Sequence, residues 1–381
     1  MSGAIYLDGL STAPLAPEAR AAMLAAWDQP GNPSSPHAAG ERAAALVETA
    51  RRSVADLVGA SSAEIVFTSG ATEANNLAIA GAAAAAITGG SERRHVVVTS
   101  IEHKSVLEAA WRLRAVGFTV DIAPVTKAGV VDLGELAALI RNDTLLVSVM
   151  AANNETAVLQ PIAEVAALAH AVGALLHCDA AQAVGKVPVD VIDLDVDFMS
   201  VSSHKMYGPM GVGALYVSAA APRPTPLLVG GGQENGLRAG TEPAPLIAGF
   251  GTAAEVARSR LEKDARHAKS LLGAFLQDLS ERQVKIHVNG NVSKLLPGAI
   301  NISIDGIDAQ SLAMIMARTV MISTGSACNS GQINSSHVLD AMDVDEKRKK
   351  EALRICFGRY HSDPDAREAA RQLGDAINRM R

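Results

Sequence analysis

A lysine near the middle of the chain stands in an unusual polar setting. The stretch SVSSHKMYGP, residues 200–209, places Lys205 directly after two serines and a histidine, and a Gly-Pro pair then ends the segment. A lysine amine can attack a carbonyl group and form a Schiff base, so a lysine so placed could act as a nucleophile. A lone lysine after a strand is more often a solvated surface residue. What the lysine does therefore depends on its neighbours.

Polar side chains follow several short apolar segments of the sequence. These side chains belong to Ser69 and Thr72, Glu102 and His103, Asn153 and Asn154, Asp179 and Gln182, and Ser202, Ser203 and His204. In a doubly wound sheet the ligand lies outside the carboxyl ends of the strands, so we expect these side chains to surround one ligand.

The residue types narrow the choice of ligand. The segment TSGAT, residues 68–72, leads into a helix and offers backbone N–H groups and a hydroxyl to a phosphate. Neither GxGxxG nor GxxxxGK[ST] occurs, which disfavours a nicotinamide or nucleoside triphosphate site. A lysine and an aspartate beside a phosphate site suit pyridoxal phosphate, because Lys205 can form the Schiff base and Asp179 can keep the pyridine nitrogen protonated.

The elements that must position these residues alternate between strands and helices. Strands are predicted at 64–70, 95–100, 145–151, 174–180, 197–203 and 213–218, and helices at 73–86, 104–116 and 161–172. Most strands are apolar on both faces, which predicts a largely parallel α/β sheet covered by helices. The last two strands are too close in sequence for a helical crossover, so we expect them to pair antiparallel.

A second domain is predicted where this pattern ends. From about Pro243 the sequence indicates a long helix, two short strands (284–288 and 299–304) and a final helix that ends at Arg381. We expect residues 17–242 to form the large α/β domain. Residues 1–16 and 243–381 would form a small α+β domain.

Composition excludes several classes of protein. The 381 residues are 48% hydrophobic and carry a formal net charge of -6, so we expect no direct nucleic-acid ligand. The N-terminus lacks the pattern of a signal peptide, and the alanine-rich runs are too short and glycine-broken to span a bilayer, so a cytoplasmic location is the default. Three cysteines without a CxxC pair favour neither a disulfide framework nor a zinc site.

At this point the sequence resembles a known family. The segments FTSGATEANNLAI, IEHKSVL, NNETAVLQPI, HCDAAQAVGKVPVD, SVSSHKMYGPMGVGALYV, GGGQENGLRAGTEP, STGSACNS and LRICFGR together are similar to those of cysteine desulfurases. These are pyridoxal-phosphate enzymes of the class V aminotransferase group with the type I fold. The segments follow the family order from Tyr6 to the C-terminal helix.

The resemblance implies a role for each matching residue. Lys205 would bond covalently to the cofactor and Asp179 would pair with its pyridine nitrogen, while Gln182 would face the phenolic oxygen. His103 would stack on the ring and assist proton transfer. The phosphate ligands would come from the matching segments around Ala71, Thr72, Ser202 and His204, and from Thr241 of a partner subunit. The substrate carboxylate would meet Asn154, Arg354 and Asn32.

Cys328 is the expected sulfur acceptor. It lies among small residues in STGSACNSGQINSS, a composition typical of a mobile loop, whereas Cys178 and Cys356 lie in apolar segments typical of a core. A loop thiolate can attack the sulfur of a bound cysteine and carry it outward as a persulfide. A loop of this length resembles the group I desulfurases.

The resemblance thus implies a homodimeric transferase that converts L-cysteine to L-alanine and passes sulfur to an acceptor protein. Iron–sulfur assembly, RNA thiolation, thiocofactor synthesis and DNA modification all remain possible destinations. Departures from the family pattern are GLSTAPLAP after YLD, Ala157 where glycine is commoner, and Met210 where lysine is frequent.

Two other functions stay open at this stage. The first is another pyridoxal-phosphate reaction on the same fold, such as that of a selenocysteine lyase or a small-amino-acid transaminase; the loop cysteine argues against the transaminase. The second is a non-catalytic scaffold that binds partner proteins, against which Lys205, Asp179 and Cys328 together argue.

Overall fold

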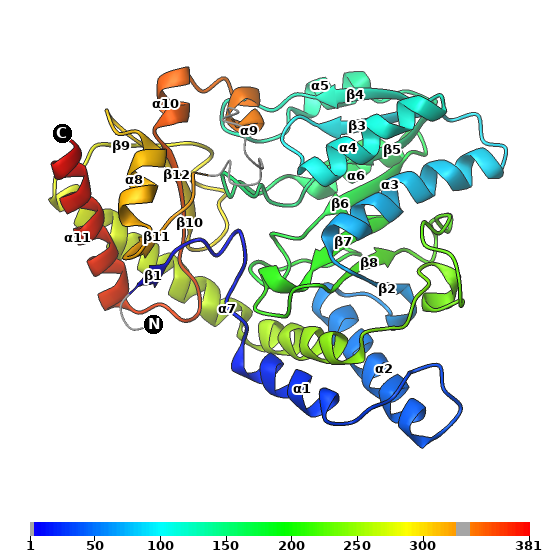
Figure 1. The fold of residues 1–381 in the computed structure, drawn as a ribbon. Helices are drawn as coiled ribbons and strands as arrows, with labels where there is room; N and C mark the ends of the chain where they lie inside the picture. The colour runs from blue at the N-terminus through cyan, green and yellow to red at the C-terminus, as the bar shows by residue number, and fades with distance from the viewer. Residues whose placement is uncertain (1–3, 325–335) are drawn as a thin grey trace.

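A computed structural model describes residues 4–324 and 336–381 (Figure 1). Its larger sheet has the strand order β2-β8-β7-β6-β5-β3-β4. The strands are β2 (Ile65–Thr68), β3 (His95–Thr99), β4 (Thr119–Ala123), β5 (Thr144–Ser148), β6 (Leu175–Asp179), β7 (Phe198–Ser202) and β8 (Gly213–Val217). The α/β fold with a mostly parallel sheet is therefore confirmed.

The strand directions agree with the sequence pattern. The neighbouring strands β4, β3, β5, β6 and β7 pair parallel with one another, whereas β8 pairs antiparallel with both β7 and β2. The predicted antiparallel pairing of the last two strands is thus confirmed. The edge strand β4 was not predicted, because only some of its side chains are buried and it lacks the continuous apolar run of the inner strands.

Helices pack on both faces of the larger sheet. The apolar side chains of α3 (Ala71–Thr88) and α4 (Lys104–Arg112) share one core with Val96 and Val98 of β3. On the other face, α2 (Ala38–Val58) and α6 (Ile162–His170) share a core with Val97 and Val147. Alternate residues of β3 therefore serve opposite cores, as strand geometry requires. The short α5 (Leu133–Leu139) and α1 (Pro17–Trp27) complete this part of the chain.

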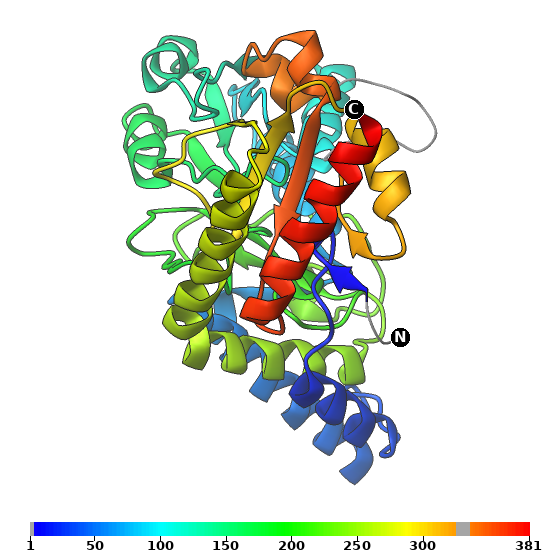
Figure 2. The ribbon, with the colours of Figure 1, turned by 90° about the vertical axis from the view of Figure 1, so that its left-hand side faces the viewer.

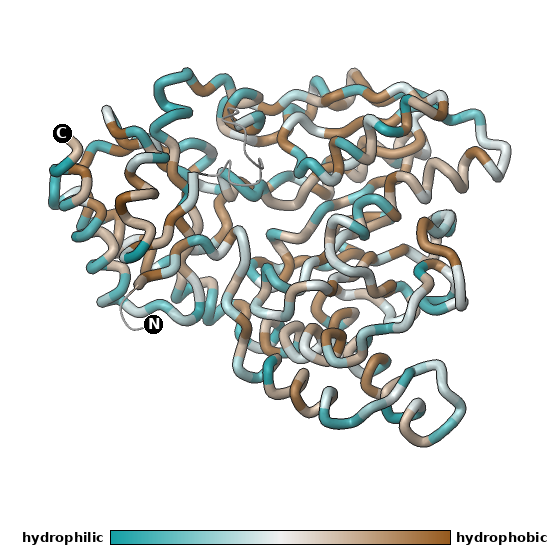
Figure 3. The backbone as a smooth tube through the Cα atoms, viewed as in Figure 1, coloured by the Kyte–Doolittle hydropathy of each residue, from teal (hydrophilic) through white to brown (hydrophobic). Residues whose placement is uncertain are grey.

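A smaller sheet lies beside the C-terminal helix. Its order is β12-β10-β9, with antiparallel strands β9 (Ile286–Val288), β10 (Ala299–Ile304) and β12 (Ala352–Cys356). The N-terminal β1 (Ile5–Tyr6) pairs parallel with β11 (Val320–Met321). The remaining helices are α8 (Ala309–Met316), α9 (His337–Ala341), α10 (Glu346–Lys350) and α11 (Asp363–Met380). Figure 3 shows α10 as a hydrophilic segment, in contrast to the brown stretches along the strands.

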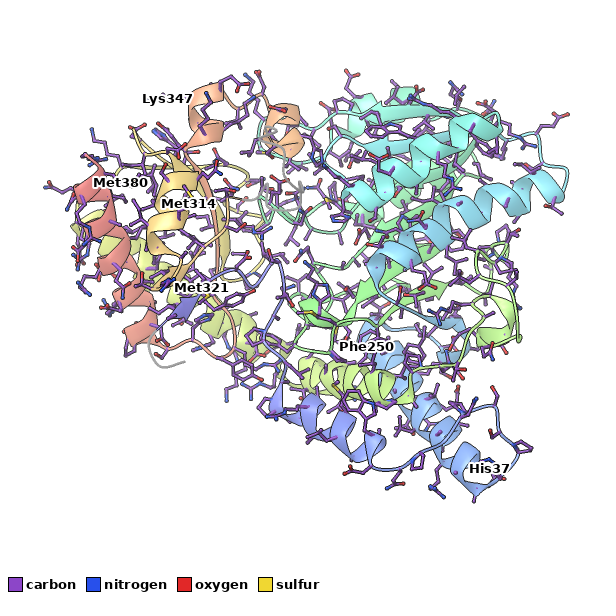
Figure 4. The ribbon with its side chains drawn as sticks, in the orientation of Figure 1. His37, Phe250, Met314, Met321, Lys347 and Met380 are labelled. Atoms are coloured by element: carbon purple, nitrogen blue, oxygen red, sulfur yellow. The ribbon has the colours of Figure 1, made fainter. Side chains whose placement is uncertain are left out.

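One long helix belongs to both cores. Helix α7 (Ala244–Glu281) runs past the larger sheet and continues alongside α11 (Figure 2). Phe250, labelled on its first half in Figure 4, packs in the core of the larger sheet, whereas Phe275 packs in that of the smaller sheet. The proposed boundary between residues 242 and 243 stays a prediction, since α7 contributes to both cores. No helix within the described ranges is both long and apolar enough to cross a membrane.

Candidate active site

A cleft of about 430 Å³ lies at the carboxyl ends of the central strands. The residues that the sequence predicted for the site and that line this cleft are Ala71, Thr72, His103, Asn154, Asp179, Gln182, Ser202, His204, Lys205 and Arg354. They come from both sheets and from the turns after five different strands.

Three predicted site residues are not part of this cleft. Asn32 and Thr241 are exposed and do not line it. Cys328 lies outside the residues that the structure describes.

One end of the cleft is suited to an anion. Helix α3 begins at Ala71, directly after Gly70, whose φ of +149° favours glycine because a side chain would strain this backbone conformation. The first N–H groups of a helix have no partner within the helix and carry partial positive charge. Thr72, Ser202 and His204 line the cleft with this turn. Backbone donors and hydroxyls in this combination are chemically suited to bind a phosphate group.

Lys205 lies in a short turn after β7. Its Nζ atom donates hydrogen bonds to the carbonyl oxygens of Leu10 (2.6 Å) and Ser11 (2.7 Å). The amide nitrogen of Gln182 also donates to the Leu10 carbonyl, at 2.9 Å. The N-terminal segment therefore positions the lysine at the wall of the cleft.

Asp179 ends β6 as a buried carboxylate, only 5% exposed. One of its oxygens accepts a hydrogen bond from the backbone N–H of Ala181 (3.0 Å), and the other accepts one from the side-chain amide of Asn75 (2.8 Å). Both bonds use the carboxylate as an acceptor, which fixes its orientation and suits it to pair with a protonated ring nitrogen.

His103 is the N-cap residue of α4. Its Nδ1 atom lies 3.2 Å from the backbone nitrogen of Ser105, which donates to it, and 2.8 Å from the Ser105 hydroxyl. Burial, above all, lowers the pKa of His103 below its usual value. The ring is therefore neutral near pH 7, as is that of His204, whose pKa burial and the charge of Lys205 lower to about 4.

Arg354 reaches the cleft from the smaller sheet. Its side chain is only 5% exposed, and its Nη2 atom bonds to Asp8 (2.7 Å) and to the Ser11 hydroxyl (2.5 Å). Its Nη1 atom donates to the carbonyl oxygen of Asn154 at 2.6 Å, while Nε has no partner among the described residues. The guanidinium is thus held in place between the larger and the smaller sheet, and its Nε–H group can still donate a hydrogen bond.

Sequence reasoning missed two groups of site residues. Asn75 and Ser105 bond to Asp179 and His103 but lie inside helices, where attention to strand ends could not find them. Leu10 and Ser11 also line the cleft, although they precede the first strand of the larger sheet by more than fifty residues. The asparagine pair in ATEANNLAI was a signal, because asparagine in an otherwise apolar helix calls for a polar partner.

The arrangement fits pyridoxal phosphate. The cleft offers an anion site at one end, a carboxylate for a pyridinium nitrogen, and a lysine amine. The buried amide oxygen of Gln182 has no partner among the described residues, so the chain alone does not satisfy this group. These are the polar contacts that the cofactor's phosphate, ring nitrogen, aldehyde and phenolic oxygen require.

Comparison with known proteins gives concordant matches. Residues 5–367 match the model of the family described as Aminotransferase class-V. The cysteine desulfurase IscS of Rickettsia bellii is 40% identical over 380 residues, which are 99% of this chain and 92% of that protein.

Solved structures are similar over a comparable length. A NifS-like protein superposes with a TM-score of 0.91 at 34% identity, covering 98% of this chain and 99% of the other. A structure of SspA in complex with cysteine superposes with a TM-score of 0.81, also at 34% identity, covering 94% of this chain and all of the other.

Proposed function

Because the chain belongs to the class-V aminotransferase family and, within it, to the cysteine desulfurases, we propose that Cys328 receives the sulfur that the enzyme releases. The protein is a pyridoxal-phosphate-dependent enzyme that converts L-cysteine to L-alanine with transfer of sulfur. The observation that carries the residue assignments is the convergence of Lys205, Asp179 and the anion site on one cleft.

The cofactor supplies an aldehyde and an electron-accepting ring when it is bound. For the chain's own residues, we assign Asp179 to the ring nitrogen and Gln182 to the phenolic oxygen. The first turn of α3, with Ala71 and Thr72, would hold the phosphate together with Ser202 and His204. Lys205 would bond to the aldehyde and, once displaced, remove the α-proton of the substrate as a base.

Substrate binding is assigned to the opposite wall. Arg354 and Asn154 would hold the substrate carboxylate, an assignment supported by the spare Nε donor of Arg354 and its bond to Asn154. Because Asp8 already pairs with Arg354, the substrate would share this guanidinium with a resident carboxylate. Asn32 would join from a partner subunit, since it is exposed and outside the cleft of its own chain.

Sulfur transfer would follow from the chemistry of a thiolate. The Cys328 sulfur attacks the sulfur of bound cysteine, an S–S bond forms, and the substrate C–S bond breaks. The electron pair of that bond stays with the three-carbon fragment, which takes up a proton and leaves as alanine. Cys328 keeps the transferred sulfur as a persulfide, which an acceptor protein then removes.

The setting of the reaction is also a proposal. We place the enzyme as a homodimer in the cytoplasm, a reducing compartment, because its chemistry depends on a free thiol. The described cysteines, Cys178 and Cys356, are both free and buried, which agrees with such a compartment. Iron–sulfur cluster assembly is the proposed destination of the sulfur, by analogy with the relatives named IscS.

The decisive experiment replaces Cys328 with serine. Cys328→Ser should still bind pyridoxal phosphate through Lys205 but should lose alanine release from cysteine, because a serine hydroxyl stays protonated near neutral pH. Mass spectrometry of wild type should find one added sulfur on the peptide that contains Cys328.

Two matched variants serve as controls. Cys178→Ser and Cys356→Ser should keep persulfide formation, because burial raises the pKa of both thiols and keeps them protonated. Full alanine production by Cys328→Ser, or a persulfide on either buried cysteine, would refute the assignment.

A further inference from the structure

A chain of hydrogen bonds joins Asp179 to His103, two residues that line the cleft. The Asn75 side-chain nitrogen donates one hydrogen to Asp179, at 2.8 Å, and the other to the Ser105 hydroxyl, also at 2.8 Å. The Ser105 hydroxyl in turn lies 2.8 Å from Nδ1 of His103. Asn75 is fully buried, and so is its bond to Asp179, whereas the two bonds of the Ser105 hydroxyl are partly buried at the cleft wall.

The direction of every bond in this chain can be assigned. The Asn75 amide must present its nitrogen to Asp179, because a flipped amide would place an oxygen against the carboxylate. The amide nitrogen then donates to the Ser105 hydroxyl, which leaves the hydroxyl proton for His103. The backbone N–H of Ser105 also donates to Nδ1 of His103, at 3.2 Å. An atom that accepts these bonds carries no proton itself.

We propose that Ser105 and Asn75 are positioning residues that hold His103 as the neutral tautomer with its proton on Nε2. The Ser105 hydroxyl could rotate away if Nδ1 were protonated, but the backbone N–H cannot, so a proton on Nδ1 would break the N-cap of α4. The positive end of the α4 dipole opposes a charged ring at the same place.

This inference rests on the proposed function and gives His103 a defined part in it. Its Nδ1 lone pair is occupied, so the ring cannot accept the α-proton of the substrate, and Lys205 remains the base. Its Nε2–H group can donate a hydrogen bond within the cleft that His103 lines. His103 would therefore act as a stacking group and a hydrogen-bond donor, and not as the proton carrier that the family resemblance suggested.

The surrounding charges act in both directions. Asp179 of β6 favours a protonated ring, whereas Lys205 after β7, His337 of α9 and Lys104 of α4 disfavour one. Burial of the ring also disfavours its protonated form. The tautomer itself is set by the two Ser105 donors, since none of these charges distinguishes Nδ1 from Nε2 by a direct hydrogen bond.

The test is nitrogen NMR of the holoenzyme labelled with ¹⁵N-histidine, with the His103 signals assigned from their absence in His103→Gln. Wild type should show a neutral ring protonated at Nε2 near pH 7, because burial lowers the pKa of His103. Ser105→Ala removes one of two donors to Nδ1 and should raise the pKa of His103 by about 0.5–1 unit. Ser105→Thr keeps a hydroxyl and should restore the wild-type value.

Ser100→Ala is the matched control, because the Ser100 hydroxyl is also buried but has no hydrogen-bond partner among the described residues. It should leave the His103 signals unchanged. A wild-type ring protonated on Nδ1, or an unchanged His103 pKa in Ser105→Ala, would overturn the proposal. The measurement does not depend on turnover, so it separates this proposal from the assignment of Cys328.

Discussion

At the scale of single residues, the most unusual group beside the cofactor cleft is a buried acid. Glu102 is fully buried, and one of its oxygens accepts bonds from Thr99 (2.5 Å) and from the backbone of Met150 (2.8 Å). Its other oxygen has no partner within the described ranges. Burial, with the charge of Asp179, raises the pKa of Glu102 to about 8, so the carboxyl stays neutral at pH 7.

This raised pKa makes a prediction about stability. Between about pH 4.5 and pH 8, the unfolded chain loses the Glu102 proton while the folded protein keeps it, so the free energy of unfolding falls as pH rises. Glu102→Gln keeps the shape and cannot ionise, so it should remove this fall, which is up to about 1.4 kcal/mol per pH unit. Urea unfolding of both proteins at a series of pH values measures the difference.

The free energy of unfolding of Glu102→Gln should therefore increase relative to that of wild type as the pH rises from about 4.5 to about 8. Two unfolding curves that stay parallel from pH 5 to pH 8 would show that Glu102 ionises normally in the folded protein.

Residue types alone identified much of the cleft but could not show how its members are joined. Lys205 and Asp179 were recognisable because each lies at or just after the end of a strand and carries a reactive group. Ala157 illustrates the limit: its φ of +63° places it in the left-handed region that favours glycine, the residue expected there from the resemblance. The residue type at position 157 does not reveal this conformation, because surrounding contacts impose it.

At the scale of elements, a buried side-chain hydrogen bond is one of the contacts that join α9 to the larger sheet, beside the packing of Val338 and Leu339 on Ile101 and Met150. The Ser336 hydroxyl caps α9 by accepting from the backbone of Leu339 (3.1 Å), and it also donates to Glu155 at 2.5 Å. Glu155 follows β5 and is buried, which raises its pKa, and the bond from Ser336 opposes that rise. This contact lies next to the residues that the structure does not describe.

Ser336→Ala should be costly because it removes a helix cap and leaves Glu155 without its hydroxyl donor. We expect a loss of about 1–3 kcal/mol in the free energy of unfolding, measured by urea denaturation of the cofactor-loaded enzyme. Ser362→Ala is the control, since Ser362 caps α11 with an exposed partner, Asp365. If both variants lose the same free energy of unfolding, the hydrogen bond from Ser336 to Glu155 does not stabilise the protein.

Element types were predictable where the sequence was strongly periodic or apolar. The inner strands and the long C-terminal helices have such patterns, and the structure contains them. The edge strand β4 was missed because solvent replaces one neighbour, so its composition need not be apolar. The two-residue strands β1 and β11 are defined by their pairing with each other, so neither is recognisable from its own residues.

At the scale of the whole molecule, the proposed dimer makes a prediction about Thr241. Thr241 is exposed and lies outside the cleft of its own chain. Arg238, three residues earlier, pairs with Glu73 of α3 at 2.9 Å, which holds this segment near the anion site. A neighbouring subunit could therefore receive Thr241 as a phosphate ligand.

Thr241→Ala should weaken cofactor retention by about 1–2 kcal/mol, which is roughly a 5- to 30-fold rise in the dissociation constant of pyridoxal phosphate. Equilibrium dialysis gives this constant, and gel filtration gives the assembly state. Thr88→Ala, at an exposed helix end, is the control and should change neither. A monomer that retains the cofactor fully would contradict the shared site.

The joining of the two sheets could not be predicted from sequence patterns. Arg354 of β12 meets Asp8 and Ser11 across almost the full length of the chain, and no local pattern reports such a contact. The helix α7 likewise gave a clear helical signal without indicating that its halves serve different cores.

The pairing of β1 with β11 has a consequence for synthesis on the ribosome. Ile5 pairs with Val320, so the first strand emerges long before its partner exists. At roughly 5–20 residues per second, the N-terminal strand waits on the order of 15–60 seconds for the rest of the chain. During that interval Ile5 and Leu7, which are buried in the finished protein, are exposed to solvent and to chaperones. Native pairing of β1 with β11, and formation of the cleft wall to which Leu10 and Ser11 contribute, therefore come late in translation.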